Sequence, residues 1–108
     1  MSADCLQVTT TLGSRAAAEL LAAQLVEERL VACAQVSGPI TSVYRWHGAV
    51  ERAEEWYCHL KTTRGRFPAL ADAIRARHSY EIPEILAAPL SGTEDYLAWV
   101  RRSVSDED

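Results

Sequence analysis

Two long strand-like runs, joined by a short glycine-containing connection, constrain the fold more than any other feature of this sequence. The runs span residues 30–46 and 50–63, and His47-Gly48 lies between them. Such a connection is typical of a tight hairpin turn, because glycine adopts positive φ without strain. Ser37-Gly38-Pro39 interrupts the first run. The sequence therefore predicts a long antiparallel hairpin with a break or bulge in its first strand.

Apolar residues recur every three or four positions in two further segments, residues 15–29 and 66–78. This spacing predicts amphipathic helices that each bury one stripe of side chains. The stripes are Ala18, Leu21, Ala22 and Leu25 in the first helix and Phe67, Leu70, Ala71 and Ile74 in the second. Ser14 is placed to cap the first helix, and Pro68 is tolerated in the first turn of the second.

Two shorter strands and a last helix complete the pattern. Strands are predicted over residues 5–11 and 84–90, and Pro83 and Pro89 favour an edge position for the second of them. Thr93 can cap the last helix. The resulting order, βαββαβ plus a C-terminal helix, is the α+β ferredoxin-like arrangement, with both first helices on one face of an antiparallel sheet. We expect a single domain over residues 1–108.

Alternation along residues 50–63 predicts what each face of the sheet carries. One face takes Trp56, Cys58 and Leu60, and the other takes Tyr57, His59 and Lys61. We expect Trp56 and its neighbours on the face that the two helices leave open, where they need cover from the last helix or from another subunit. The sequence therefore predicts a homo-oligomer, in which the protruding hairpin over residues 40–56 pairs with a neighbour.

Composition excludes several classes of function. The net charge of −4 and the absence of a basic stripe argue against nucleic-acid binding. Apolar runs are too short to span a membrane, and the first residues do not resemble a signal peptide, so we expect a cytoplasmic protein. Three cysteines without a Cys-x-x-Cys pair form neither a disulfide framework nor a zinc site. No nucleophile–base pair, phosphate loop or metal triad can be read, so we expect no enzyme.

Several separate blocks, in matching order, resemble the CutA family of divalent-cation tolerance proteins. They are residues 28–34 (Glu-Arg-Leu-Val-Ala-Cys-Ala), residues 42–48 (Ser-Val-Tyr-Arg-Trp-His-Gly), Glu51, residues 61–63 (Lys-Thr-Thr), residues 78–85 (His-Ser-Tyr-Glu-Ile-Pro-Glu-Ile) and residues 96–99 (Tyr-Leu-Ala-Trp). The resemblance extends over nearly the whole chain. Where the family pattern reads His-Pro-Tyr-Glu, this chain has serine at position 79.

The resemblance implies a homotrimer of ferredoxin-like subunits, similar to PII-type signalling trimers, with clefts between neighbours. It also implies a role in the response to, or tolerance of, divalent metal ions, with copper or another divalent metal as a ligand. One copper site proposed for the family combines a cysteine at the end of the first strand with histidines just before the Tyr-Glu run. Here Thr9-Thr10-Thr11 stands at the first position and His78 at the second.

His78 is the candidate metal ligand, because an imidazole binds Cu(II) or Zn(II). The alternative is a histidine at a helix C-terminus that interacts with the last carbonyl groups.

A second candidate site suits a small polar ligand, because it combines an ammonium group with carboxylates and aromatic rings. Its members are Trp46, Glu51, Lys61, Tyr80, Glu81 and Glu84, and Lys61 is the only lysine of the chain. The same residues could instead form a salt-bridge network that fixes the register of the trimer.

Two functions therefore remain open. In the first, the trimer binds copper, another metal or a small ligand at clefts between subunits. In the second, it is a structural or adaptor trimer that docks a partner protein and binds no metal of its own.

Overall fold

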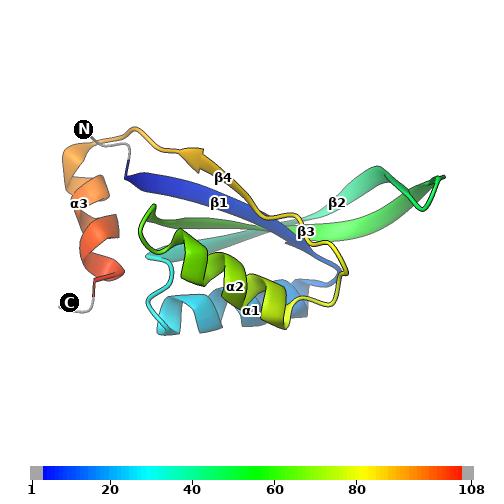
Figure 1. The fold of residues 1–108 in the computed structure, drawn as a ribbon, viewed down its shortest axis with the longest axis horizontal. Coiled ribbons are helices and arrows are strands. Elements are labelled where there is room, and N and C mark those ends of the chain that lie inside the picture. Colours follow the sequence, from blue (N-terminus) through cyan, green and yellow to red (C-terminus); the bar gives the residue numbers. More distant parts are fainter. Residues whose placement is uncertain (1–3, 106–108) are drawn as a thin grey trace.

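The protein folds into one antiparallel sheet of four strands with three helices, and the computed structural model describes residues 4–105 (Figure 1). In chain order the elements are β1 (Cys5–Leu12), α1 (Arg15–Glu27), β2 (Cys33–Trp46), β3 (Ala49–Thr63), α2 (Phe67–Arg77), β4 (Leu86–Pro89) and α3 (Glu94–Ser103). The strands lie in the order β2-β3-β1-β4. The predicted βαββαβ order with a C-terminal helix, and with it the ferredoxin-like α+β fold, is confirmed.

β1 lies between β3 and β4, and both pairings are antiparallel. Val8, at the centre of β1, is opposite Leu60 of β3 and Ala87 of β4. β2 and β4 are the two edges of the sheet, so the edge position predicted for β4 is confirmed. Each edge strand leaves one row of backbone groups without a partner strand in the single chain.

α1 and α2 lie side by side on one face of the sheet, and the main core is between them and the strands (Figure 1). Both predicted stripes are buried at positions such as Leu21, Leu25, Leu70 and Ile74. Full burial of a side chain of this size stabilises the fold by about 1.5–3 kcal/mol. Among residues 4–105, no helix is long and apolar enough to cross a membrane.

The placement expected for Trp56 and its neighbours is wrong. Cys58 and Leu60 belong to the core beneath the helices, and Trp56 packs against that core. Cys58 donates from Sγ to the Ala18 carbonyl over 3.4 Å, and burial raises the pKa of its thiol to about 11. The helix stripes need apolar partners, so the apolar set of β3 turns toward α1 and α2, and the polar set faces the opposite side.

α3 covers one end of the opposite face. Its residues Leu97 and Val100 form a second, smaller core with Cys5 and Ala32. The rest of this open face carries the polar alternation of β3, including His59 and Lys61, both half-buried. Cover by the last helix, one of the two options predicted, is therefore present at one end of the sheet.

The break predicted in β2 is a β-bulge. Ser37 pairs with Tyr57 and Ile40 pairs with Glu55, so Gly38 and Pro39 together stand opposite the single residue Trp56. Gly38 has φ of 145°, and a Cβ atom built there would lie 2.7 Å from Cδ1 of Trp56. Only glycine fits a backbone that approaches the indole ring this closely.

The predicted hairpin turn is also confirmed. His47 and Gly48 both have positive φ, 49° and 81°, as a two-residue hairpin turn requires. β2 and β3 extend together beyond the end of β1, and their tip protrudes from the body of the molecule (Figure 1).

Several predicted boundaries need correction. The first helix ends at Glu27 and not at residue 29, because Arg29 adopts a left-handed φ of 61°. The second strand begins at Cys33, since residues 30–32 form the connection to it. The fourth strand is only Leu86–Pro89. Thr93 occupies the N-cap position of α3, but its side chain makes no capping hydrogen bond.

Replacing Gly38 by alanine tests the bulge. The added Cβ would clash with the Trp56 ring, so we expect Gly38→Ala to lower the free energy of unfolding by about 2 kcal/mol or more. Gly65→Ala is the matched control, because a Cβ there meets nothing within 4 Å; its stability should be unchanged or slightly raised. Urea unfolding at equal protein concentration measures both, and equal midpoints would contradict the proposed role of the bulge.

Candidate functional site

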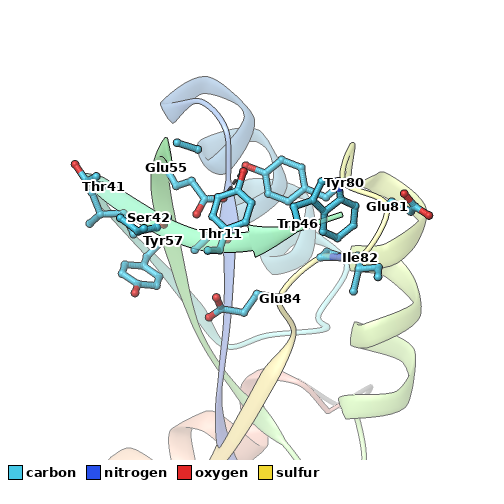
Figure 2. A pocket seen from close by; sticks show the side chains of 15 residues that line it. Thr11, Thr41, Ser42, Trp46, Glu55, Tyr57, Tyr80, Glu81, Ile82 and Glu84 are labelled. Carbon is cyan, nitrogen blue, oxygen red and sulfur yellow. Dashed lines mark hydrogen bonds between the residues drawn. The ribbon is translucent and has the colours of Figure 1, made fainter. Parts of the chain in front are cut away.

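A groove of about 1020 Å³ lies where the β2–β3 hairpin extends beyond β1 (Figure 2). One wall comes from the hairpin, a second from the segment that follows α2, and Thr11 at the end of β1 lies between them. The groove is lined by Thr11, Ile40, Thr41, Ser42, Val43, Tyr44, Trp46, Ala53, Glu55, Tyr57, Tyr80, Glu81, Ile82, Pro83 and Glu84. Three glutamates and four aromatic side chains thus share one concave surface.

Glu55 and Tyr80 form the most buried polar contact of the groove. Glu55 is only 7% exposed, and its Oε2 accepts a hydrogen bond of 2.7 Å from the Tyr80 hydroxyl. Burial, together with this hydrogen bond to a carboxylate, raises the pKa of Tyr80 above its ordinary value of 10. The phenol therefore stays protonated and remains a donor at physiological pH.

His78 positions the segment that carries Tyr80. It follows the last residue of α2, and its Nε2 donates to the Thr11 carbonyl over 2.7 Å. Its Nδ1 accepts from the Tyr80 backbone N–H over 3.1 Å. Because a carbonyl only accepts and an amide N–H only donates, these two hydrogen bonds place a ring proton on Nε2 and leave Nδ1 as the acceptor. A metal ion could bind His78 only after one of these hydrogen bonds has been broken.

Glu84, on the segment that follows α2, is a second carboxylate that lines the groove (Figure 2). Partial burial, and then the nearby charge of Glu55, raise the pKa of the Glu84 carboxyl above its ordinary value. Glu81 is exposed and lies at the edge of the groove. The groove therefore concentrates negative charge, and the carboxylates of Glu55 and Glu84 repel each other.

Of the predicted ligand residues, the structure brings Trp46, Tyr80, Glu81 and Glu84 together at this groove. The other two lie elsewhere in the single chain. Glu51 is opposite Tyr44 near the tip of the hairpin. Lys61 is six positions beyond Glu55 along β3, roughly 20 Å away, and its Nζ donates to Gln35 Oε1 over 2.9 Å.

Sequence reasoning missed Glu55, which is the most buried carboxylate of the site. The alternation of β3 places it on the polar face with Tyr57, but no local pattern connects it with Tyr80, 25 residues away along the chain. Only the packing of the segment after α2 against the hairpin brings the two together.

A single chain does not supply a complete set of metal ligands. Within residues 4–105, no three His, Cys, Asp or Glu side chains come together in a way that could hold a metal ion. The groove offers carboxylate oxygens, whereas Cu(II) prefers imidazole and other nitrogen ligands. Thr9, Thr10 and Thr11 add only hydroxyl groups at the end of β1.

The sheet order, the helix pair on one face and the acidic groove beside a long hairpin define a ferredoxin-like domain with a candidate binding site at its hairpin. The sequence model of the family described as "CutA1 divalent ion tolerance protein" matches residues 6–103. The chain therefore belongs to the CutA1 divalent ion tolerance family.

Individual relatives agree with this assignment. The divalent-cation tolerance protein CutA of Thermus thermophilus is 41% identical over 97 residues, which cover 89% of this chain and 94% of the relative. Human protein CutA is 42% identical over 82% of this chain, and the match spans only 52% of the human protein. Both carry the CutA name; the family is named for divalent-ion tolerance and not for an enzymatic activity.

Solved structures extend the agreement to three dimensions. The divalent cation tolerance protein of Thermus thermophilus superimposes with a TM-score of 0.89 at 40% identity, over 92% of this chain and 97% of that one. CutA from Xylella fastidiosa superimposes with a TM-score of 0.91 at 31% identity, over 94% of this chain and 99% of that one. The fold described above is thus the fold of CutA1 proteins.

Replacing Tyr80 by phenylalanine tests the contact at the base of the groove. Loss of the hydroxyl leaves a buried carboxylate oxygen without its donor, so we expect Tyr80→Phe to cost about 1–2 kcal/mol of stability. Tyr44→Phe, in the same groove but 44% exposed, is the matched control and should stay within about 0.5 kcal/mol of the parent protein.

The same pair of variants predicts a pH dependence. Because the pKa of Tyr80 is higher in the folded than in the unfolded chain, its contribution is fully present below pH 10 and is lost as the pH rises above 10. The parent protein should therefore lose more stability than Tyr80→Phe between pH 9 and about 11. Urea unfolding at both pH values measures this, and parallel losses would contradict the assignment.

Proposed function

We propose that this protein is a homotrimer that binds divalent metal ions, copper among them, or a small ligand in clefts between its subunits, and that it contributes to metal tolerance in this way. The observation that carries the proposal is the position of the acidic groove. It lies beside the protruding hairpin, where a second subunit would reach it, and one chain alone, over the residues described, does not complete a metal site.

Exposed apolar side chains near the groove support assembly. Val43 and Val50 on the hairpin are 56% and 66% exposed. Ile82, which precedes β4, and Leu86, its first residue, are 71% and 62% exposed. Side chains of this kind gather at surfaces that are covered in an assembly. The free edges of β2 and β4 offer backbone hydrogen bonds to a neighbouring copy.

A second chain would also change the ligands available to a metal ion. His78 lies directly beside the groove, since it contacts both Thr11 and Tyr80. If the metal replaces one of the two hydrogen bonds of the His78 imidazole, this nitrogen and the carboxylates of one subunit would together form a mixed oxygen and nitrogen site.

We also propose a cytoplasmic location, because Cys5, Cys33 and Cys58 are free thiols and reducing compartments maintain such thiols.

The exposed hairpin favours a second candidate function. Val43 and Val50 could dock a different protein, which would make the protein an adaptor trimer without metal binding of its own. The two candidates differ in one measurable property, the specific uptake of metal by the purified trimer.

Native mass spectrometry of metal-stripped protein, with and without Cu(II), tests the proposal. We expect a trimer that takes up a fixed number of copper ions per subunit, and uptake that is lost in His78→Ala. His47→Ala is the matched control, because His47 is an exposed histidine at the tip of the hairpin and does not line the groove.

The possible outcomes separate the candidates. A trimer that takes up copper equally well in His78→Ala would exclude the site at His78. A trimer without specific metal uptake would favour the adaptor or an organic ligand. A monomer at micromolar concentration would overturn the proposed assembly.

A further inference from the structure

A second, smaller hollow lies beside the C-terminal end of α3, at the end of the molecule opposite the hairpin tip (Figure 1). Its volume is about 490 Å³, and we call it the arginine pocket. It is lined by Asp4, Thr63, Gly65, Arg66, Arg101, Val104 and Ser105. Two arginines and one acid belong to this described lining, so its charge is opposite in sign to that of the groove at the hairpin.

Two arginine side chains from other parts of the fold converge on the last carbonyl groups of α3. Arg66, which precedes α2, donates from Nε to the Val104 carbonyl over 2.8 Å. Arg29, which follows α1, donates from Nη1 to the Ser103 carbonyl over 3.5 Å. Guanidinium groups are favourable at this position, because the C-terminal end of a helix carries partial negative charge. The contacts attach the end of α3 to the loops after α1 and β3.

The acid of the lining is matched to an arginine of α3. Asp4 accepts at Oδ2 from Nε of Arg101 over 3.0 Å, and this hydrogen bond holds the pKa of the Asp4 carboxyl below its ordinary value. Arg101 also donates from Nη1 to Glu94 over 3.1 Å. Asp4 and Arg101 therefore balance each other within the pocket. A further anionic group is favoured beside Arg66, on the opposite wall.

The chain leaves the arginine pocket toward three consecutive acids. Ser105, the last described residue, lines the pocket. The acidic tail, residues 106–108 (Asp-Glu-Asp), follows it and lies outside the described residues. Three residues extend over at most about 10 Å, and Arg66 contacts Val104, only two positions before the tail. The carboxylates of the tail are therefore tethered near Arg66, at an effective concentration in roughly the millimolar range.

We propose that the acidic tail docks in the arginine pocket of its own chain and pairs there with Arg66 and the adjacent Arg64. Carboxylates and guanidinium groups form charge-assisted hydrogen bonds, often two in parallel. One exposed pair of this kind is weak, whereas several pairs on a tethered segment form a network. The docked tail adds to the capping of α3 and so helps to hold this helix on the end of the sheet that it covers. The site lies away from the groove of the proposed function and does not depend on it.

NMR relaxation of the ¹⁵N-labelled full chain in its native assembly tests the proposal. The order parameter S² of a backbone amide is about 0.85 in rigid structure and below about 0.6 in a flexible segment. We expect S² above about 0.6 for Asp106 and Glu107 at about 0.1 M NaCl. It should fall below that value when Arg64→Gln and Arg66→Gln are combined. It should also fall in about 1 M NaCl, where the screening length is about 3 Å.

Arg75→Gln is the matched control. Arg75 is also an exposed arginine, pairs with Asp72, and lies on α2 roughly 13 Å beyond Arg66 along the helix axis. This variant should leave the order parameters of the tail unchanged. Arg64→Gln alone preserves the contact between Arg66 and Val104 and should still lower S² of the tail. It remains informative if the loss of Arg66 displaces α3.

Two relaxation results would overturn the inference. In the first, S² of the tail in the parent protein is below about 0.6 at low salt. In the second, the tail stays ordered in the combined Arg64→Gln and Arg66→Gln variant, which would place it on another surface, such as a second copy of the chain.

Inorganic phosphate distinguishes a docked tail from an open anion site. When Asp106→Asn, Glu107→Gln and Asp108→Asn are combined, phosphate should shift the amide signals of Gly65 and Ser105, which line the pocket, at about tenfold lower concentration than in the parent protein. Equal phosphate binding by both proteins would show that the tail does not occupy the pocket and would overturn the inference.

Discussion

The contact between the Gly38 backbone and the Trp56 ring is the constraint on which the site depends. The bulge inserts one residue into β2, and a shift of one residue exchanges the two faces of a strand. After the bulge, Ile40 is opposite Glu55, so Ser42, Tyr44 and Trp46 lie on the same side of the hairpin as Glu55. Without that shift, the alternate residues of β2 would line this side, and the tyrosine and tryptophan would lie on the other.

A chain of hydrogen bonds then closes the groove from the opposite wall. His78 joins the end of α2 to the Thr11 carbonyl of β1, and the Tyr80 backbone donates to the same imidazole. Tyr80 in turn donates to Glu55. Each link satisfies a polar group that is at least partly buried, so the segment after α2 holds one position against the hairpin although it contains no regular structure. His78 is therefore both a structural element of the site and its candidate metal ligand.

Local sequence patterns predicted the fold well at positions where the residue type itself favours one backbone conformation. Glycine at the hairpin turn and the Gly38-Pro39 interruption both marked real features of the backbone. The stripes of α1 and α2 were predicted for the same reason, because the period of 3.6 is local. Local patterns did not predict which face of β3 packs against the helices. Alternation places Trp56 and Tyr57 on opposite faces, but which of these two faces is covered by the helices depends on how the layers stack. Helix and strand ends moved by a few residues, since they depend on contacts with neighbouring elements.

The site shows the same division. The sequence alone was enough to identify the aromatic and acidic residues of the segment after α2 as site candidates and to predict the tight hairpin, since both depend on neighbouring residues. It was also enough to assign the family, since that depends on blocks of sequence in a given order. Only the tertiary structure decided that Glu55 would be buried against Tyr80 and that, within one chain, Lys61 would donate to Gln35 and not to a carboxylate of the groove. The physical reason is that burial and charge pairing depend on which elements meet in space. In a sheet with the order β2-β3-β1-β4, residues meet that are far apart in the sequence.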